Sequence, residues 1–384
     1  MEPIDDPGDL DKLAAALGGP SAAPPPAGGG LRPWLEAMAG HGASDLLLLP
    51  GEPPAFRVDG RFLRSGGGPL DGDDVTALVL PELPAHAQRA FRESGITDAA
   101  LKIPGAGRFR VNLHRERGRS AAVVRRLPAK VPALASLNLP AGADQLARLG
   151  RGLVIVGGAT GSGKTTTLAA LVDDVNQREE KHIITIEDPV EYEHSNKRSL
   201  IQHVEIGVDA PDFPTALRSA LRQAPDIIVV GEMRDPETMR IALAAGETGH
   251  LVLTTLHTTD VASTIARLTD SFPAERQPTI RQEMAAALSA VFVQTLVPAT
   301  AGGRLPAAEL LMVQYGARQH IRRNALQHLH QEMTITRKLG SFTLEESLAQ
   351  LVREEVIDRE EAQTRAAHPE MLKELLRDFW PTIS

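Results

Sequence analysis

A glycine-rich loop between an apolar run and a helical run is the feature that most constrains how this chain can fold. Residues 158–165 read Gly-Ala-Thr-Gly-Ser-Gly-Lys-Thr, which is the spacing of a phosphate-binding loop. The apolar residues 153–156 predict a strand directly before the loop, and residues 166–171 predict a helix directly after it. Glycines let backbone N–H groups close around a phosphate, and a helix start adds partial positive charge. This pattern predicts a nucleotide site.

Each residue of the loop has an expected role. Lys164 is expected to reach the β- and γ-phosphates, and the Thr165 hydroxyl is expected to ligate Mg²⁺. ATP and Mg²⁺ are therefore the predicted ligands. The predicted nucleotide-binding residues of the loop are Gly158, Ala159, Thr160, Gly161, Ser162, Gly163, Lys164, Thr165 and Thr166.

Four short apolar runs indicate the fold class around this loop. Strands that are apolar on both sides belong to a sheet covered on both faces, which is typical of a parallel α/β core. Helical stretches separate the runs, as such a core requires. The runs are residues 153–156, 183–186, 227–230 and 251–255.

Acidic residues follow two of these runs. Ligands of open α/β sheets bind at the carboxyl ends of the strands, where a carboxylate can hold the metal's water shell or orient the attacking water. Glu191 and Glu232 are predicted to be catalytic, and Glu232 is also a metal candidate. Glu187 and Asp188 are further metal candidates, although Asp188 could instead cap the turn at Pro189.

The whole chain is predicted to divide into four parts. Residues 1–30 are rich in Pro, Gly and Ala and predict a disordered leader. Residues 31–137 contain short alternating segments and a hairpin signal at Asp59-Gly60, which indicate a small α+β domain. The ATPase domain is expected over residues 138–340, and a helical segment over residues 341–384, with Pro369 starting its last helix.

Composition excludes several function classes. The chain has no cysteine, which removes disulfides, thiol catalysis and cysteine-type zinc sites. A net charge of −8 and an aromatic content of 3% argue against nucleic acid as a partner. No apolar run approaches the roughly 20 residues of a membrane span, and the acidic first residues do not form a signal peptide. A cytoplasmic protein is therefore expected.

The motifs, taken together and in this order, resemble the type II/type IV secretion ATPase superfamily. Within it they are most similar to the PilT-like pilus retraction ATPases of twitching motility. The resemblance spans residues 31 to 365. It is carried by the phosphate loop and by residues 183–191, 196–200, 226–235 and 247–258.

This resemblance implies a homohexameric ring of chains, each with a PAS-like N-terminal domain and a RecA-like ATPase domain. It implies that the ring acts on a pilus platform protein of the inner membrane and lies peripheral to that membrane. A paralogous pilus motor is a further candidate partner. The resemblance also implies that Glu191 activates water. It implies catalytic roles for Glu232, His257 and His250, and nucleotide contacts for Arg110 and Arg125.

The chain departs from the family in ways that leave its role open. Residues 317–324 keep little of a motif tied to retraction, and the zinc insert of assembly and secretion ATPases is missing with the cysteines. Three alternatives to a retraction motor therefore remain. They are an accessory or pilus-assembly/secretion motor, a nucleotide-dependent scaffold with little turnover, and a nucleic-acid translocase, which charge and composition disfavour.

Overall fold

The computed structural model describes residues 30–377. Its contacts divide the chain into two units that meet between Ala129 and Lys130. The sequence placed this boundary at residues 137/138, but residues 130–137 belong to the second unit because Leu134 packs against its hydrophobic core. The expected leader, apart from Gly30, lies outside the described residues, as do residues 378–384.

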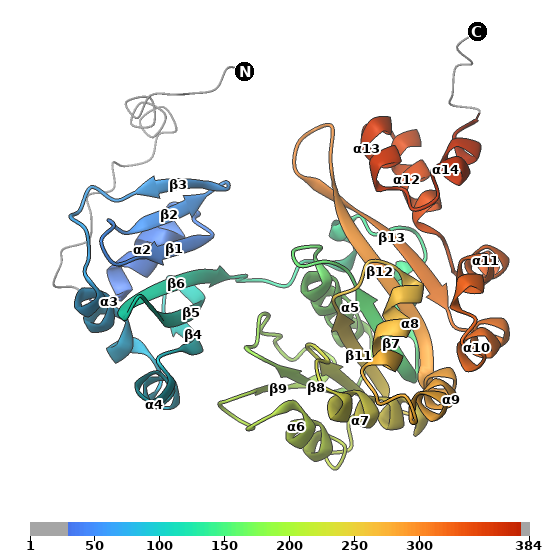
Figure 1. Cartoon of the computed structure of the whole chain (residues 1–384), viewed down its shortest axis with the longest axis horizontal. Coiled ribbons are helices and arrows are strands. Elements are labelled where there is room, and N and C mark those ends of the chain that lie inside the picture. The colour runs from blue at the N-terminus through green and yellow to red at the C-terminus, as the bar shows by residue number, and fades with distance from the viewer. Residues whose placement is uncertain (1–29, 378–384) are drawn as a thin grey trace, which may run out of the picture. The chain divides into compact units, whose positions relative to one another are not determined.

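The first unit is an antiparallel six-stranded sheet with helices packed on it (Figure 1). The strand order is β3-β2-β1-β6-β5-β4. The strands are β1 (Asp45–Leu48), β2 (Ala55–Val58), β3 (Arg61–Arg64), β4 (Thr97–Ile103), β5 (Gly107–Glu116) and β6 (Arg119–Leu127). The helices are α2 (Arg32–Gly40), α3 (Gly72–Val79) and α4 (Ala85–Ser94).

Local sequence explains this unit well. Asp59 and Gly60 both have positive φ, of 47° and 81°, and they connect β2 and β3 in the predicted hairpin. Along β5, Phe109, Val111 and Leu113 are fully buried while their neighbours are half-buried, as the alternating pattern requires. The prediction of a small α+β domain is confirmed.

The second unit contains a seven-stranded sheet in the order β13-β12-β7-β11-β10-β8-β9. All neighbouring strands are parallel except β12 and β13. The strands are β7 (Gly152–Gly157), β8 (His182–Glu187), β9 (Leu200–Glu205), β10 (Ile227–Val230), β11 (Leu251–Leu256), β12 (Leu288–Pro298) and β13 (Arg304–Met312).

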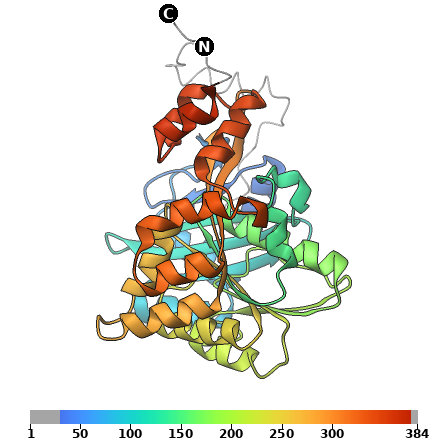
Figure 2. The ribbon, with the colours of Figure 1, turned by 90° about the vertical axis from the view of Figure 1, so that its right-hand side faces the viewer.

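Helices follow or flank these strands. The first five are α5 (Lys164–Arg178), α6 (Phe213–Ala220), α7 (Pro236–Glu247), α8 (Val261–Asp270) and α9 (Gln277–Ala287). The others are α10 (Tyr315–Arg322), α11 (Leu329–Ile335), α12 (Leu344–Arg353), α13 (Arg359–Arg365) and α14 (Pro369–Leu375). Figure 2 shows α9, α10 and α11 one above another, with α12–α14 in a separate group.

The parallel register places the carboxyl ends of neighbouring strands side by side. Gly157 of β7 pairs with Leu256 of β11, while Val230 of β10 pairs with Thr254 of β11 and Ile186 of β8. Four carboxyl ends therefore meet at one edge. Every residue of β7, β10 and β11 is buried, which explains why these strands are apolar throughout. The predicted α/β fold with a parallel core is confirmed.

Two long strands were not predicted from the sequence. Helix α9 ends at Ala287 and β12 begins at Leu288, so no turn residue separates them. Strand β12 then runs beside β7 and returns antiparallel as β13. The shorter strands β4 and β9 were not predicted either, because neither contains a continuous apolar run.

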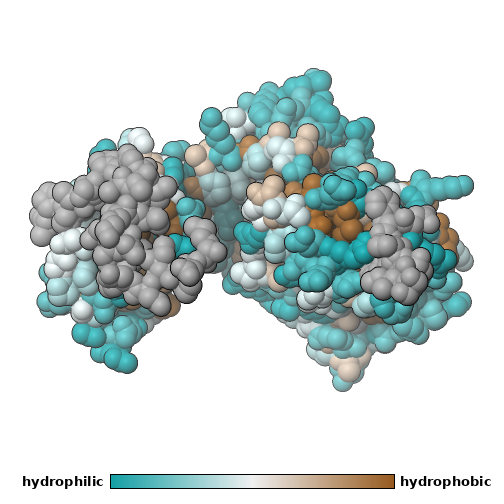
Figure 3. All heavy atoms as spheres, turned by 90° about the horizontal axis from the view of Figure 1, so that it is seen from above, coloured by the Kyte–Doolittle hydropathy of each residue, from teal (hydrophilic) through white to brown (hydrophobic). Residues whose placement is uncertain are grey.

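The C-terminal helices form a small cluster of their own on the β12–β13 hairpin. Thr343 caps α12 in a reciprocal capping box with Glu346, and α14 begins at Pro369 as predicted. Leu348 and Leu372 pack with Val297 of β12. Seen from above, the second unit has a hydrophobic patch surrounded by hydrophilic residues (Figure 3).

A buried carboxylate lies between this cluster and helix α8 of the parallel sheet domain. Glu309 of β13 is 8% exposed and accepts a hydrogen bond from the backbone N–H of Val261, at the start of α8. Burial raises the pKa of Glu309 to about 7, and the charges of Asp260 and Glu345 act in the same direction. Nearby, the interaction with Glu345, whose Oε2 is 3.5 Å from His330 Nε2, raises the pKa of His330.

We predict that stability falls as pH rises from 5 to 8, and that Glu309→Gln removes much of this fall. A raised pKa means that the folded state keeps its proton when the unfolded state has lost it, so this stabilisation is lost as pH rises from about 4.5 to about 7. The variant should unfold like the parent at pH 5 and be more stable at pH 8, by up to about 3 kcal/mol. Calorimetric unfolding at several pH values measures this. Glu275→Gln, at an exposed position, is the control. Parallel pH curves for parent and Glu309→Gln would contradict the prediction.

Candidate functional site

The phosphate loop lies at the carboxyl end of β7 and requires glycine at several positions. Strand β7 ends at Gly157, and α5 begins at Lys164. Gly158 and Gly163 have φ of +149° and +89°, which L side chains rarely adopt. A Cβ on Gly158 would lie 2.3 Å from Ser162 Oγ and 2.5 Å from the carbonyl oxygen of Gln294. The loop is therefore closely packed on the neighbouring strand.

Lys164 points back into the loop. Its ammonium donates hydrogen bonds to the carbonyl oxygens of Gly158 and Ala159, at 2.8 and 2.9 Å, and it is only 7% exposed. Burial lowers the pKa of Lys164, and the charges of Glu232 and Glu191 partly offset this effect. A buried cation held by two neutral carbonyls is well placed to bind a stronger, anionic acceptor.

Two other strand ends converge on this lysine. His257 follows β11, and its Nδ1 lies 3.3 Å from Lys164 Nζ and 3.4 Å from Thr160 Oγ1. Its Nε2 lies 3.4 Å from an oxygen of Glu232, which follows β10. The other oxygen of Glu232 accepts hydrogen bonds from Arg234 at 2.8 and 2.9 Å. Lys164, Glu232 and His257 therefore lie together at one edge of the sheet.

The charge state of Glu232 follows from these neighbours. Desolvation opposes ionisation, but the hydrogen bond and charge of Arg234, together with His257 and Lys164, hold the pKa of Glu232 below its ordinary value. Glu232 is therefore an anion at neutral pH. It is suited to hold positive charge and poorly suited to take up a proton.

The segment after β8 forms the next part of the same edge. The backbone N–H of Glu191 donates to a carboxylate oxygen of Glu187 at 3.2 Å, so Glu187 stabilises this turn. Asp188 is exposed and precedes Pro189 through a cis peptide bond. The hydroxyl of Tyr192 is 3.0 Å from Thr166 Oγ1, which attaches the segment to α5.

His250 is not brought to this site within the chain. It precedes β11, whereas His257 follows it, so a six-residue strand of about 20 Å separates them. His250 Nδ1 lies 3.3 Å from the carbonyl oxygen of Ala245 and 3.5 Å from Thr248 Oγ1. The pairing of His250 with His257 near the phosphates is therefore not found in this structure.

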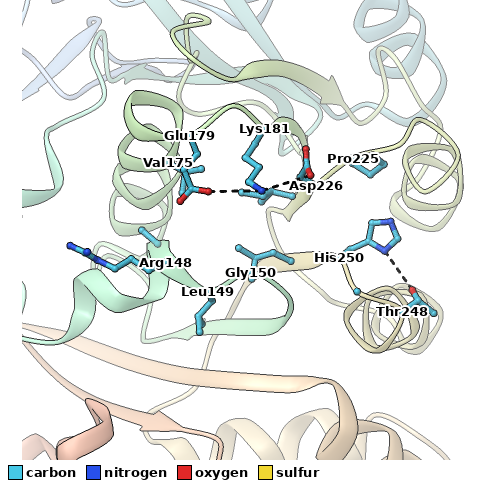
Figure 4. Close-up of a pocket in the computed structure, with 14 residues that line it drawn as sticks. Arg148, Leu149, Gly150, Val175, Glu179, Lys181, Pro225, Asp226, Thr248 and His250 are labelled. Carbon is cyan, nitrogen blue, oxygen red and sulfur yellow. Dashed lines mark hydrogen bonds and ion pairs between the residues drawn. The ribbon is translucent and has the colours of Figure 1, made fainter.

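His250 instead lines a pocket of about 280 Å³ at the amino edge of the sheet (Figure 4). Lys181 also lines it and lies 4.0 Å from Glu179 and 3.9 Å from Asp226. The pocket and the phosphate loop are thus on opposite edges of one sheet.

Arg110 and Arg125 belong to the first unit. They are register partners on β5 and β6. Arg110 pairs with Asp98 at 2.7 Å, and Arg125 donates to the buried carboxylate of Asp45 at 2.9 Å. These ion pairs give each arginine a role within its own sheet. Their predicted contact with the nucleotide stays a prediction.

Sequence reasoning missed the residue that packs most closely on the loop, Gln294 of β12. No signal pointed to it, because β12 itself was not predicted. Metal ligation was predicted for Thr165, Glu232, Glu187 and Asp188. Over residues 30–377, no three His, Cys, Asp or Glu side chains are grouped so that they could hold a metal ion. A metal here would need oxygen atoms from the phosphates and water besides the protein's own.

The loop, the buried lysine and the carboxylates at the carboxyl edge of a parallel sheet define a P-loop nucleotide-binding protein of the α/β class. The sequence matches the family described as "Type II/IV secretion system protein" over residues 101–379. The chain belongs to this family. Between residues 30 and 377, no helix has the length and apolar character needed to cross a membrane.

Individual relatives narrow the comparison. The chain is 42% identical to the type IV pilus retraction ATPase PilT of Pseudomonas aeruginosa, over 88% of this chain and 98% of that protein. It is 37% identical to the type IV pilus ATPase PilU of the same organism, over 86% and 87% of the two chains. A crystal structure of the pilus retraction motor PilT with bound ADP superimposes with a TM-score of 0.80. It is 39% identical and covers 88% of this chain and 98% of that chain.

We predict that Gly158→Ala abolishes nucleotide binding without unfolding the protein. The added methyl group would collide with the backbone of Gln294 and with Ser162, so the loop would shift from its position. Calorimetric titration with ADP measures the effect, and we expect at least a hundredfold loss of affinity. Gly150→Ala is the control, because nothing lies within 4 Å of a Cβ there. Unchanged affinity in Gly158→Ala would show that this loop does not hold the phosphates.

Proposed function

We propose that this protein is an ATP-hydrolysing motor that works as a homohexamer and powers retraction of a type IV pilus. The single observation that carries ATP use is the convergence of Lys164, Glu232 and His257 at the phosphate loop. The pilus role is supported by the similarity to PilT over nearly its whole length. Similarity to the ADP-bound PilT structure further supports a nucleotide at this loop.

The contacts of Lys164 within the loop indicate how ATP binds. The ammonium of Lys164 exchanges the carbonyl oxygens of Gly158 and Ala159 for oxygens of the β- and γ-phosphates. The backbone N–H groups of the loop and the start of α5 hold the β-phosphate. Thr165, in the first turn of α5, and the anionic Glu232 fit Mg²⁺ as a hydroxyl ligand and as an acceptor for metal-bound water. When bound, Mg²⁺ neutralises charge on the phosphates.

Glu191 and Glu232 have different roles in this scheme. Arg234 keeps Glu232 ionised, so Glu232 stabilises positive charge rather than accepting a proton. Glu191 lies close enough for its charge to act on Lys164, and we assign it the orientation of the attacking water. Glu187 orders the backbone of Glu191 and is a positioning residue here.

His257 is placed to report the state of the nucleotide. Its two ring nitrogens face Lys164 and Glu232, so movement of Lys164 onto a phosphate changes the neighbours of the imidazole. His257 precedes Asp260, the N-cap of α8. Loss of the γ-phosphate would therefore act on α8 through a short segment.

The partners follow from the same proposal. The motor would act on a pilus platform protein of the inner membrane, from the cytoplasmic side and peripheral to the membrane, alone or with a paralogous motor. Nucleic acid is not a proposed partner. The domain division into a leader, a PAS-like domain, a RecA-like domain and a helical segment belongs to this proposal. So does nucleotide contact by Arg110 and Arg125 in the ring.

The second candidate function is an accessory motor, and the observation behind it is the altered segment in α10. The segment at residues 317–324, where a retraction motif is expected, has Arg318 bound to the end of α9. Its guanidinium donates to the carbonyl oxygens of Ala285, Ala286 and Leu288. The segment therefore has a structural use in this chain.

We predict that Lys164→Ala abolishes ATP turnover and that Glu191→Ala still binds ATP but hydrolyses it at least a hundredfold more slowly. The first variant loses the phosphate ligand, and the second loses only the group that orients water. Steady-state phosphate release and nucleotide titration separate the two effects. Loss of ATP binding in Glu191→Ala would assign that residue a structural role. A parent protein that binds ATP without turnover would indicate a nucleotide-dependent scaffold.

Direction of work is tested in the host. We predict that deleting the gene leaves many surface pili and abolishes surface motility, because assembly continues without retraction. Electron microscopy and a motility assay measure the two effects, and the intact gene supplied in trans is the control. Cells without pili would indicate an assembly motor, and normal pili with nearly normal motility would indicate an accessory one.

A further inference from the structure

The loop of the nucleotide site is attached to β12 through one buried side chain. Gln294 follows Val293, which pairs with Gly157 at the end of β7, so Gln294 lies directly beside the loop. The side chain is only 3% exposed. Gln294 belongs to strand β12 and not to the loop, and it is not one of the residues assigned to phosphate, metal or water above.

Both ends of the Gln294 amide are used. Its Nε2 donates to the carbonyl oxygen of Ser162 at 2.5 Å, and its Oε1 accepts from the hydroxyl of Thr167 at 2.8 Å. A carbonyl oxygen can only accept a hydrogen bond, so the orientation of the amide is fixed. One side chain thus connects the loop just before Lys164 to the first turn of α5 just after it.

The glycines of the loop leave the room that Gln294 occupies. A Cβ on Gly163 would lie 3.0 Å from Nε2 of Gln294, and one on Gly158 would lie 2.5 Å from its carbonyl oxygen. Both ends of the glycine pattern therefore pack against this one residue of β12. Positive φ accounts for part of the glycine requirement, and close contacts with Gln294 and Ser162 add to it.

This connection does not depend on Lys164. The lysine presently holds the loop through the carbonyl oxygens of Gly158 and Ala159, and those contacts are lost when the ammonium moves to a phosphate. The hydrogen bonds of Gln294 go to Ser162 and Thr167 and can persist through that exchange. After the exchange, the hydrogen bonds of Gln294 would still connect the loop to β12.

We propose that Gln294 is a positioning residue that keeps the phosphate loop in its nucleotide-binding shape, independently of Lys164. This inference rests on the proposed use of ATP. It implies that loss of Gln294 weakens ADP and ATP alike, because both need the loop in this shape. The chemical step at saturating ATP should change little, since Gln294 does not contact the reacting atoms.

The test compares three variants of the full chain in ADP titration and in steady-state ATP hydrolysis. Gln294→Met keeps the length of the side chain and removes both hydrogen bonds. We expect the Kd for ADP and the KM for ATP to rise about tenfold, with kcat within about twofold of the parent. Thr167→Val removes one of the two bonds and should raise both constants about threefold. It also keeps the proposal testable if Gln294→Met does not fold.

The control is Gln177→Met, on the same helix. Gln177 donates its amide hydrogen bond to Asp173 at 2.7 Å, away from the loop, so its loss should leave Kd and KM unchanged. Parent-like Kd and KM in Gln294→Met would overturn the proposal. A fall in kcat at unchanged KM would also overturn it, because that result indicates fewer folded sites. A parent protein that binds neither ADP nor ATP would instead overturn the proposed function on which this inference depends.

Discussion

The site depends on the parallel register of four buried strands. The site combines side chains that are far apart in the sequence. Lys164 and His257 are more than 90 positions apart, yet Lys164 Nζ lies 3.3 Å from His257 Nδ1. They meet because β7 and β11 pair from Gly152↔Leu251 to Gly157↔Leu256, so both strands end at the same level. A slip of this register would separate the histidine from the loop while leaving the core hydrophobic.

Charge balance at this edge is the second organising factor. A lysine would be costly to bury alone, and the carboxylates of Glu232 and Glu191 offset part of that cost. Glu232 is in turn held ionised by Arg234. Positive and negative groups therefore alternate from the loop to β10. Entry of a polyanionic phosphate would disturb this arrangement, which gives a physical route from nucleotide state to protein conformation.

The sequence predicted the parts of the fold that have a local signal. Apolar runs located β7, β8, β10 and β11, the Asp59-Gly60 pair located a hairpin, and Pro369 located the start of α14. The glycine pattern located the loop, strand-end position located Glu232, and the family resemblance pointed to His257. Strand β12 had no such signal, because it follows α9 without a turn and continues an apolar segment.

Other features of the site depend on the folded sheet rather than on local sequence. Gln294 could not be predicted, because its role depends on which strand lies beside β7, and that is a property of the sheet order. His250 and His257 lie at opposite ends of one strand, so within the chain only His257 reaches the phosphate loop. Arg110 and Arg125 have local partners in Asp98 and Asp45, which no spacing in the sequence reveals.

The most direct test of the account is a crystal structure of the full chain with Mg²⁺ and a non-hydrolysable ATP analogue. The account predicts phosphates at residues 158–165, with Lys164 Nζ moved from the carbonyl oxygens of Gly158 and Ala159 to phosphate oxygens. It also predicts that Gln294 still bonds to Ser162 and Thr167. Phosphates bound elsewhere, or Lys164 still on the loop carbonyls with the analogue bound, would contradict it.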